Sequence, residues 1–150
     1  MNWAPLLFIL LILAVGYAHV TQKHAAEQVT ERFLEAVQSG DPRAVAALFC
    51  PDAILLGTVS QIERRGRDIR KYFDYFAKLP NIHVVERTHE ISELEPDIYV
   101  DNALVTWAWD GHEPLTARMS FMVKDGCIFE LHSSELPHES EKLHEASGKW

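Results

Sequence analysis

The side chains best suited to hold a metal ion or to act as a base are eight histidines and two cysteines. No two histidines stand two or four residues apart, and the chain has neither an HExxH nor a CxxC motif. The spacing therefore predicts no metal site, although distant segments could still assemble one in space. We expect Cys50 and Cys127 to be buried small side chains, with one disulfide as the alternative if the domain is exported.

Single polar side chains within apolar segments are the other candidates for chemistry. Tyr72 lies on the apolar face of an expected helix, as a core tyrosine or as a functional hydroxyl. Arg118 lies in a strand among apolar residues, and a buried arginine needs either a bound anion or a carboxylate such as Glu130 or Asp52. One basic cluster is expected to be a solvated loop and helix start: Arg64, Arg65, Arg67, Arg70 and Lys71.

Hydrophobic periodicity and turn signals predict the elements that must position these groups. Gly40 ends a first helix and Asp41-Pro42 starts a second, and the apolar spacing predicts helices at residues 24–39, 42–49 and 68–79. Pro51 is expected to close the second helix, and residues 61–67 to form a polar loop. Alternating apolar residues and two Asp-Gly turn signals predict strands at residues 53–58, 82–94, 99–109, 115–124 and 127–134.

Helices followed by a run of antiparallel strands predict an α+β fold, in which three helices pack on a strongly curved sheet. Such a cone has a pocket between its helices and the concave face of the sheet. On the last strand, Phe129, Leu131 and Ser133 share one face and His132 points to the other. If Ser133 lines the pocket, His132 cannot also do so unless a bulge intervenes.

The N-terminal segment differs from the rest of the chain because residues 1–22 carry no charged side chain. Ten apolar residues, Leu6 to Val15, precede Gly16-Tyr17-Ala18, whose small residues suit a signal peptidase. We expect residues 1–18 to be a cleaved signal peptide, or a membrane anchor formed by residues 3–18. The domain, residues 19–137, would then be exported to a periplasm, lumen or medium, or anchored, with a mobile polar tail at residues 138–150.

Several stretches resemble the nuclear-transport-factor-2-like (NTF2-like) superfamily, whose fold is the cone described above. The resemblance begins with Gly40-Asp41-Pro42 and continues through Ala46-Ala47-Leu48-Phe49 to the run from Pro51 to Leu56. It therefore implies the same fold as the element order, with N-terminal helices packed on a curved antiparallel sheet.

Further motifs resemble the branch that includes the association domain of calcium/calmodulin-dependent protein kinase II, and within it the iota-class carbonic anhydrases. These motifs are Thr58-Val59-Ser60, Ile69-Arg70-Lys71-Tyr72-Phe73, Ala117-Arg118-Met119-Ser120-Phe121, and His132-Ser133-Ser134 followed by Pro137. The chain departs from the family pattern at Gly57, where a proline is usual, and at Leu131, where a second histidine is usual.

The resemblance implies hydration of CO2 to bicarbonate without a metal or other cofactor, in an apolar pocket where hydroxyl groups position the water. It assigns Thr58, Tyr72 and Ser133 as catalytic residues. His132 is the candidate base if it reaches the pocket. Substrate-binding positions would be Arg118, Ser120, Ser60 and His132, with Phe129 and Leu131 as an apolar wall.

Two other classes of function remain open. The same cone could be a non-catalytic domain that binds a small carboxylate or drives oligomerisation, which the loss of a histidine at Leu131 favours. It could also be an isomerase or cyclase acting on a larger apolar substrate, with Asp52 or His132 as the acid-base group. A net charge of −8 argues against nucleic acid as a partner. The resemblance implies a homodimer or higher oligomer, to which Trp107 and Trp109 could contribute wall or interface packing.

Overall fold

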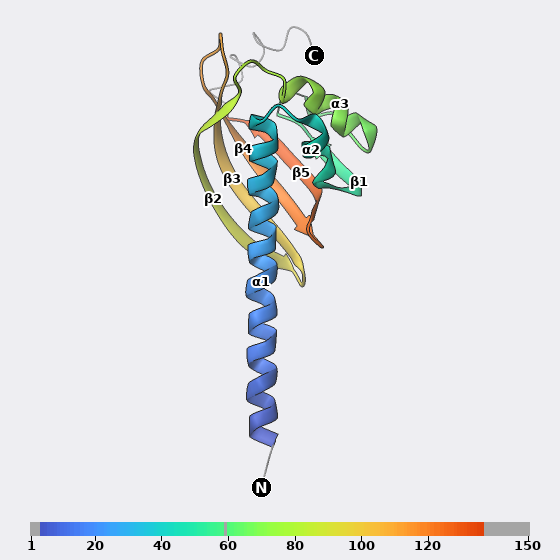
Figure 1. The fold of residues 1–150 in the computed structure, drawn as a ribbon, viewed down its shortest axis with the longest axis vertical. Coiled ribbons are helices and arrows are strands. Elements are labelled where there is room, and N and C mark those ends of the chain that lie inside the picture. Colours follow the sequence, from blue (N-terminus) through green and yellow to red (C-terminus); the bar gives the residue numbers. More distant parts are fainter. Residues whose placement is uncertain (1–3, 59, 137–150) are drawn as a thin grey trace.

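The computed structural model describes residues 4–58 and 60–136, and it has the α+β cone expected from the element order (Figure 1). The expected tail at 138–150 lies outside the described residues. Helices cover one face of a five-stranded sheet with the order β1-β5-β4-β3-β2. The elements are α1 (Ala4–Gln38), α2 (Pro42–Ala47), β1 (Phe49–Leu56), α3 (Arg67–Phe76), β2 (His83–Glu95), β3 (Ile98–Ala108), β4 (Leu115–Lys124) and β5 (Cys127–Glu135).

Helix α1 is longer than predicted, because it begins at Ala4 and continues without a break to Gln38. Gly16 does not interrupt it, since a single glycine costs only about 1 kcal/mol within a helix of leucine, isoleucine and alanine. Its N-terminal half extends away from the sheet (Figure 1), and the apolar side chains there are exposed: Ile9, Leu11, Ile12, Leu13, Val15 and Val20. Within the described residues, no helical segment has the length and hydrophobicity that crossing a bilayer requires.

The first strand also begins earlier than predicted. Helix α2 ends at Ala47, and Phe49 and Pro51 belong to β1 rather than to the helix or its end. The predicted cap is confirmed, because the Asp41 carboxylate accepts the N–H groups of Arg43 and Ala44, each at 3.0 Å. Strand β1 is an edge strand, and its pairing with β5 is interrupted between Phe49 and Ile54. Pro51 is tolerated there because no ladder hydrogen bond is required of it.

The remaining strands match the predicted ranges to within one residue at each end. Alternation is confirmed on β3, where Val105 and Trp107 are buried, and on β4, where Ala117, Met119 and Phe121 are buried. Trp107 packs edge-on against Phe76 of α3, and Trp109 is also buried beyond the end of β3. The apolar area of these two tryptophans therefore lies in the core, so of the two expected roles the structure shows internal packing and not an interface.

A buried polar cluster joins α1 to the edge of the sheet, and the sequence analysis did not anticipate it. Asp101 of β3 is 1% exposed, and its carboxylate accepts hydrogen bonds from Thr30 of α1 at 2.7 Å and from Arg87 of β2 at 2.8 Å. The ring of His89 lies 3.2 Å from the same carboxylate, and Arg87 also pairs with Glu31. Because these contacts join Thr30 and Glu31 of α1 to side chains of β2 and β3, the cluster fixes α1 against both strands.

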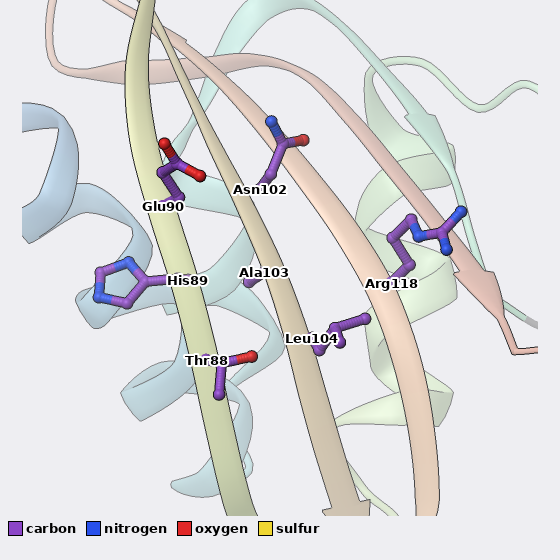
Figure 2. Close-up of a pocket in the computed structure, with 7 residues that line it drawn as sticks. All are labelled: Thr88, His89, Glu90, Asn102, Ala103, Leu104 and Arg118. Atoms are coloured by element: carbon purple, nitrogen blue, oxygen red, sulfur yellow. The ribbon is translucent and has the colours of Figure 1, made fainter.

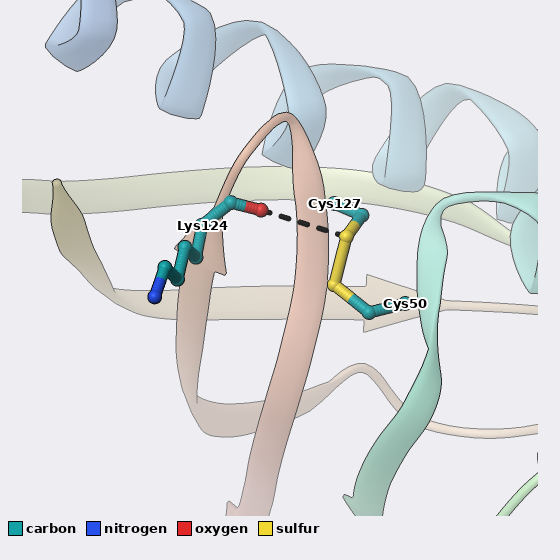
Figure 3. Close-up of a disulfide and its surroundings, with 3 residues drawn as sticks. All are labelled: Cys50, Lys124 and Cys127. Atoms are coloured by element: carbon teal, nitrogen blue, oxygen red, sulfur yellow. Dashed lines mark hydrogen bonds between the residues drawn. A yellow bond between two sulfur atoms is a disulfide. The ribbon is translucent and has the colours of Figure 1, made fainter.

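Cys50 of β1 and Cys127 of β5 form a disulfide, so the expectation of two buried free thiols is wrong (Figure 3). Sequence spacing could not show this pairing, because 77 residues separate the two cysteines and only the β1–β5 pairing brings them together. The Lys124 carbonyl lies 3.5 Å from the Cys127 sulfur. A disulfide sulfur carries no hydrogen, so this is a contact and not a hydrogen bond.

Reduction of this disulfide is expected to destabilise the fold by about 2–4 kcal/mol, because it releases a long closed loop in the unfolded chain. Chemical denaturation with and without dithiothreitol measures the effect. The Cys50→Ala/Cys127→Ala double variant is the control, and its midpoint should not respond to the reductant. Equal midpoints for the oxidised and reduced wild-type protein would contradict the prediction.

Candidate functional site

A small cavity lies between α1, α3 and the inner face of the sheet. Its volume is about 10 Å³, close to the smallest space that holds one water molecule. Three lining residues carry hydroxyl groups: Thr58, Tyr72 and Ser133. The rest are apolar or glycine: Phe33, Leu55, Gly57, Phe73, Phe76, Met119 and Leu131. The structure thus brings together all three residues that the resemblance assigned as catalytic.

Thr58 and Ser133 meet because β1 and β5 are parallel neighbours. The register pairs Leu56 with His132, so Gly57 comes level with Ser133, and Thr58, the next residue after the end of β1, contacts the Ser133 side chain. The Thr58 and Ser133 hydroxyl oxygens are in hydrogen-bond contact, and either group can donate. Both residues are buried, with 8% and 4% of their surface exposed. A hydroxyl pair in such a place can orient one further polar molecule, because each oxygen both donates and accepts.

The side chain of Gln61 clamps the two strands behind this pair. Its amide nitrogen donates to the carbonyl oxygens of Gly57 and Ser133, each at 2.8 Å. The sequence analysis placed Gln61 in a polar loop without a role. No signal in its local sequence indicates the clamp, because the second bond reaches a residue 72 positions away.

Tyr72 reaches the cavity from α3, where its ring is fixed on several sides. It packs edge-on against Phe73, at 5.1 Å between ring centroids, and stacks on Phe76 at 6.1 Å. A Cβ added at Gly57 would lie 2.5 Å from two ring carbons of Tyr72 and 2.8 Å from its hydroxyl oxygen. Glycine at position 57, one of the departures from the family pattern, therefore lets the Tyr72 ring lie directly against the backbone.

Leu131 lines the cavity from β5, as its predicted facing requires, and it is 1% exposed. Phe129 does not line the cavity. A register shift pairs Met122 with Glu130 and Val123 with Ile128, so Phe129 is the extra residue of a β-bulge. The expected wall of Phe129 and Leu131 is therefore reduced to Leu131.

His132, Ser120 and Arg118 point to the opposite face of the sheet. The His132 ring lies 2.6 Å from the carboxylate of Glu130, and the Ser120 hydroxyl donates to the Asn102 side chain at 2.6 Å. His132 is exposed, so the facing argument that separates it from Ser133 is confirmed. It is therefore not placed to act as a base in the cavity.

Arg118 is exposed, and the expectation that it is buried is wrong. It borders a broad outer groove of about 540 Å³ together with Thr88, Glu90, Asn102 and Leu104 (Figure 2). Within the described part of the chain it forms no ion pair, so the expected pairing with Glu130 or Asp52 is absent. Ser60 is half-buried and, like Arg118, does not line the inner cavity.

Among residues 4–58 and 60–136, no group of three or more histidine, cysteine, aspartate or glutamate side chains could hold a metal ion.

Comparisons with known proteins agree with the geometry of the fold. Residues 30–131 match the family described as SnoaL-like domain. No curated protein matches the sequence. Among solved structures, a candidate calcium/calmodulin dependent protein kinase II association domain from Xanthomonas campestris is 30% identical, with a TM-score of 0.61. That similarity covers 72% of this chain and 83% of the other.

Two more distant structures share the fold alone. An LEH-like epoxide hydrolase from M. tuberculosis is 18% identical over 80% of this chain and 89% of its own, with a TM-score of 0.58. A candidate polyketide cyclase from Xanthomonas campestris pv. campestris is 15% identical over 81% of this chain and 98% of its own, with a TM-score of 0.63.

Substitution of Gly57 by alanine is expected to push the Tyr72 ring out of place and to destabilise the protein by about 1–3 kcal/mol, the usual effect of overpacking. Chemical denaturation of Gly57→Ala, Tyr72→Ala and the double variant gives a double-mutant cycle. The cost of Gly57→Ala should largely vanish once the ring is absent. The same cost in both backgrounds would show that the ring does not rest on Gly57.

Proposed function

The chain belongs to the SnoaL-like domain family, within the NTF2-like fold, and we propose that it hydrates CO2 to bicarbonate as an iota-class carbonic anhydrase. The observation that carries the proposal is the cavity whose polar side chains, among the described residues, are the hydroxyl groups of Thr58, Tyr72 and Ser133. These are the positions that the resemblance assigns to catalysis. The remaining wall is apolar, which suits a gas with no hydrogen-bond donor.

In the proposed reaction, the Thr58–Ser133 pair holds a water molecule and aims its oxygen at the carbon of CO2. A new C–O bond forms as one C=O π bond opens, and the negative charge develops on the CO2 oxygens. The Tyr72 hydroxyl donates a hydrogen bond to that charge, in the manner of an oxyanion hole. The proton that the water loses passes through the hydroxyl pair to solvent. Positioning supplies most of the acceleration, because neutral hydroxyls are weak bases.

Cavity size and lining favour this reaction over cyclisation or epoxide opening. A space of about 10 Å³ holds about one water molecule, so the proposed reaction requires side-chain rotations that make room for CO2 beside it, whereas a polyketide would have to separate the helices from the sheet. Among the described residues that line the cavity there is no carboxylate and no imidazole. Acid-base chemistry on a larger substrate would need such a group within hydrogen-bond reach.

Leu131 is expected to keep the rate of CO2 hydration low. The position lines the cavity, and the family pattern has a histidine there, so this chain has an apolar wall where a base would otherwise lie. A non-catalytic domain that binds a small carboxylate or assembles into homodimers is the alternative. It is supported by Leu131 and by the 30% identity to the candidate association domain.

The disulfide supports export of the domain. Structural disulfides persist in oxidising compartments and are rare in the cytosol. We propose that residues 1–18 direct the chain out of the cytoplasm, as a cleaved signal or as an anchor, and that residues 19–137 are the functional domain.

Purified full-length protein is expected to accelerate CO2 hydration in a stopped-flow pH-indicator assay, with and without a strong chelator. Thr58→Ala, Tyr72→Phe and Ser133→Ala should each lower kcat by about 10²-fold, the usual effect of losing one transition-state hydrogen bond. Ser134→Ala is the matched control, because Ser134 is the adjacent hydroxyl on the outer face of β5. Its rate should equal that of the wild type.

Absence of activity in folded protein would contradict the carbonic anhydrase proposal and favour the binding domain. Activity that chelator abolishes and zinc restores would contradict the side-chain mechanism. The Leu131→His variant restores the histidine of the family pattern as a possible base. It should raise the rate of CO2 hydration if the hydroxyl pair already positions the water.

Export is tested by producing the full chain in a bacterial host. We expect the protein in the periplasmic or membrane fraction with Cys50 and Cys127 oxidised, as thiol-labelling mass spectrometry would show. A variant lacking residues 2–18 should remain in the cytoplasm with free thiols. Recovery of both proteins from the cytoplasm would contradict the proposal.

A further inference from the structure

Residues 60–66 precede α3, and this loop folds back onto the end of β1. Arg64 pairs with Leu55 of β1 through two backbone hydrogen bonds, each 3.0 Å long. This bridge, together with the Gln61 clamp, holds the loop beside the end of β1. The loop therefore presents its side chains at a defined place next to the cavity wall.

The guanidinium of Arg64 lies over the ring of Tyr72. Its central carbon is 4.9 Å from the ring centroid, within the range of a cation–π contact. One terminal nitrogen, Nη1, donates to the carbonyl oxygens of Ser60 at 3.1 Å and Ile62 at 2.9 Å. Arg64 is half-buried, so its charge is partly removed from solvent while its position is fixed from two sides.

Three of the four neighbouring cations in the same basic cluster are paired with carboxylates, and the fourth, Arg67, is exposed and forms no ion pair within the described residues. Arg65 pairs with Glu63 at 2.5 Å, and Arg70 with Asp74 at 3.9 Å. Lys71 pairs with Asp68 at 2.8 Å, and this hydrogen bond lowers the pKa of the Asp68 carboxyl. In the described part of the chain Arg64 has no carboxylate partner; its Nη1 is bonded to two backbone carbonyls.

We propose that Arg64 is an anion-binding residue that holds bicarbonate, or another small carboxylate, beside the Tyr72 ring. The inference deepens the proposed function and, for bicarbonate as the physiological ligand, rests on it. An arginine that is fixed through Nη1 keeps further N–H groups in a fork that matches the two oxygens of a carboxylate. Arg64 thus takes the substrate-binding role that the resemblance assigned to Arg118, because Arg118 lies on the opposite face of the sheet.

The position also suits the direction of the reaction. CO2 is neutral and gains little from a nearby cation, whereas the product is an anion that forms beside the Tyr72 hydroxyl. A cation beside the same tyrosine favours release of the product from a cavity that offers its charge only neutral hydroxyl groups. In the reverse reaction it collects bicarbonate from solvent.

Binding is tested separately from turnover by titrating the full chain with 13C-formate, which the proposed reaction does not convert, at constant ionic strength and following the NMR linewidth, with 13C-bicarbonate as a second ligand. Arg64→Gln is expected to weaken binding about tenfold or more, the loss of about one charge-assisted interaction. Arg64→Lys keeps the charge but not the forked pair of N–H donors, so its affinity should lie between those of the wild type and Arg64→Gln. Arg65→Gln on the same loop and Arg118→Gln on the outer face are matched controls and should bind like the wild type.

Unchanged binding by Arg64→Gln, or loss of binding by Arg118→Gln, would overturn the inference. If Arg64→Gln unfolds in a thermal melt, the folded Arg64→Lys variant decides, and equal affinity to the wild type for both ligands would overturn it. CO2 hydration is measured on the same samples. If the protein hydrates CO2 but binds anions equally well without Arg64, only the proposed anion site is contradicted. If anion binding depends on Arg64 but the protein does not hydrate CO2, only the carbonic anhydrase proposal is contradicted.

Discussion

Parallel pairing of β1 with β5 is the constraint on which the site depends. These strands are far apart in the sequence, and their register brings the end of β1 level with Ser133, where Thr58 contacts it in a buried region. The Cys50–Cys127 disulfide fixes the pair at one end, and the Gln61 amide fixes it at the other. A slip of one residue would turn Ser133 outward and His132 inward, since neighbouring side chains on a strand face opposite sides. The hydroxyl pair exists only in the register that these two links hold.

The helices complete the site by supplying its apolar wall and the third hydroxyl. Phe33 of α1 and Phe73 and Phe76 of α3 line the cavity, and Tyr72 projects between them. The Asp101 cluster holds α1 in place from the far edge of the sheet, through Thr30. The charges of this cluster lie away from the site, and the described residues that line the cavity are uncharged. This separation gives a dry pocket in which a few hydroxyl groups can act strongly, because hydrogen bonds are stronger where water is excluded.

Local patterns predicted much of the fold, because alternation and turn residues act over short distances. Strands β2 to β5 and the Asp41 N-cap of α2 were predicted from such local patterns. Prediction was wrong where a distant contact decides the outcome. Pro51 is accepted in β1 because of a gap in the pairing with β5, and Phe129 leaves the cavity wall because of a bulge that β4 imposes. Resemblance located the three hydroxyl residues. It could not show Gln61 or the cation over Tyr72, since both depend on how one loop folds back.

The most direct test of the central claim is a crystal structure of the protein frozen under CO2 pressure. The proposed chemistry predicts CO2 or bicarbonate in the cavity, with a water molecule bonded to the Thr58 and Ser133 hydroxyls and the ligand oxygen within hydrogen-bond distance of the Tyr72 hydroxyl. A cavity that stays empty under pressure, with CO2 bound only elsewhere on the protein, would contradict it.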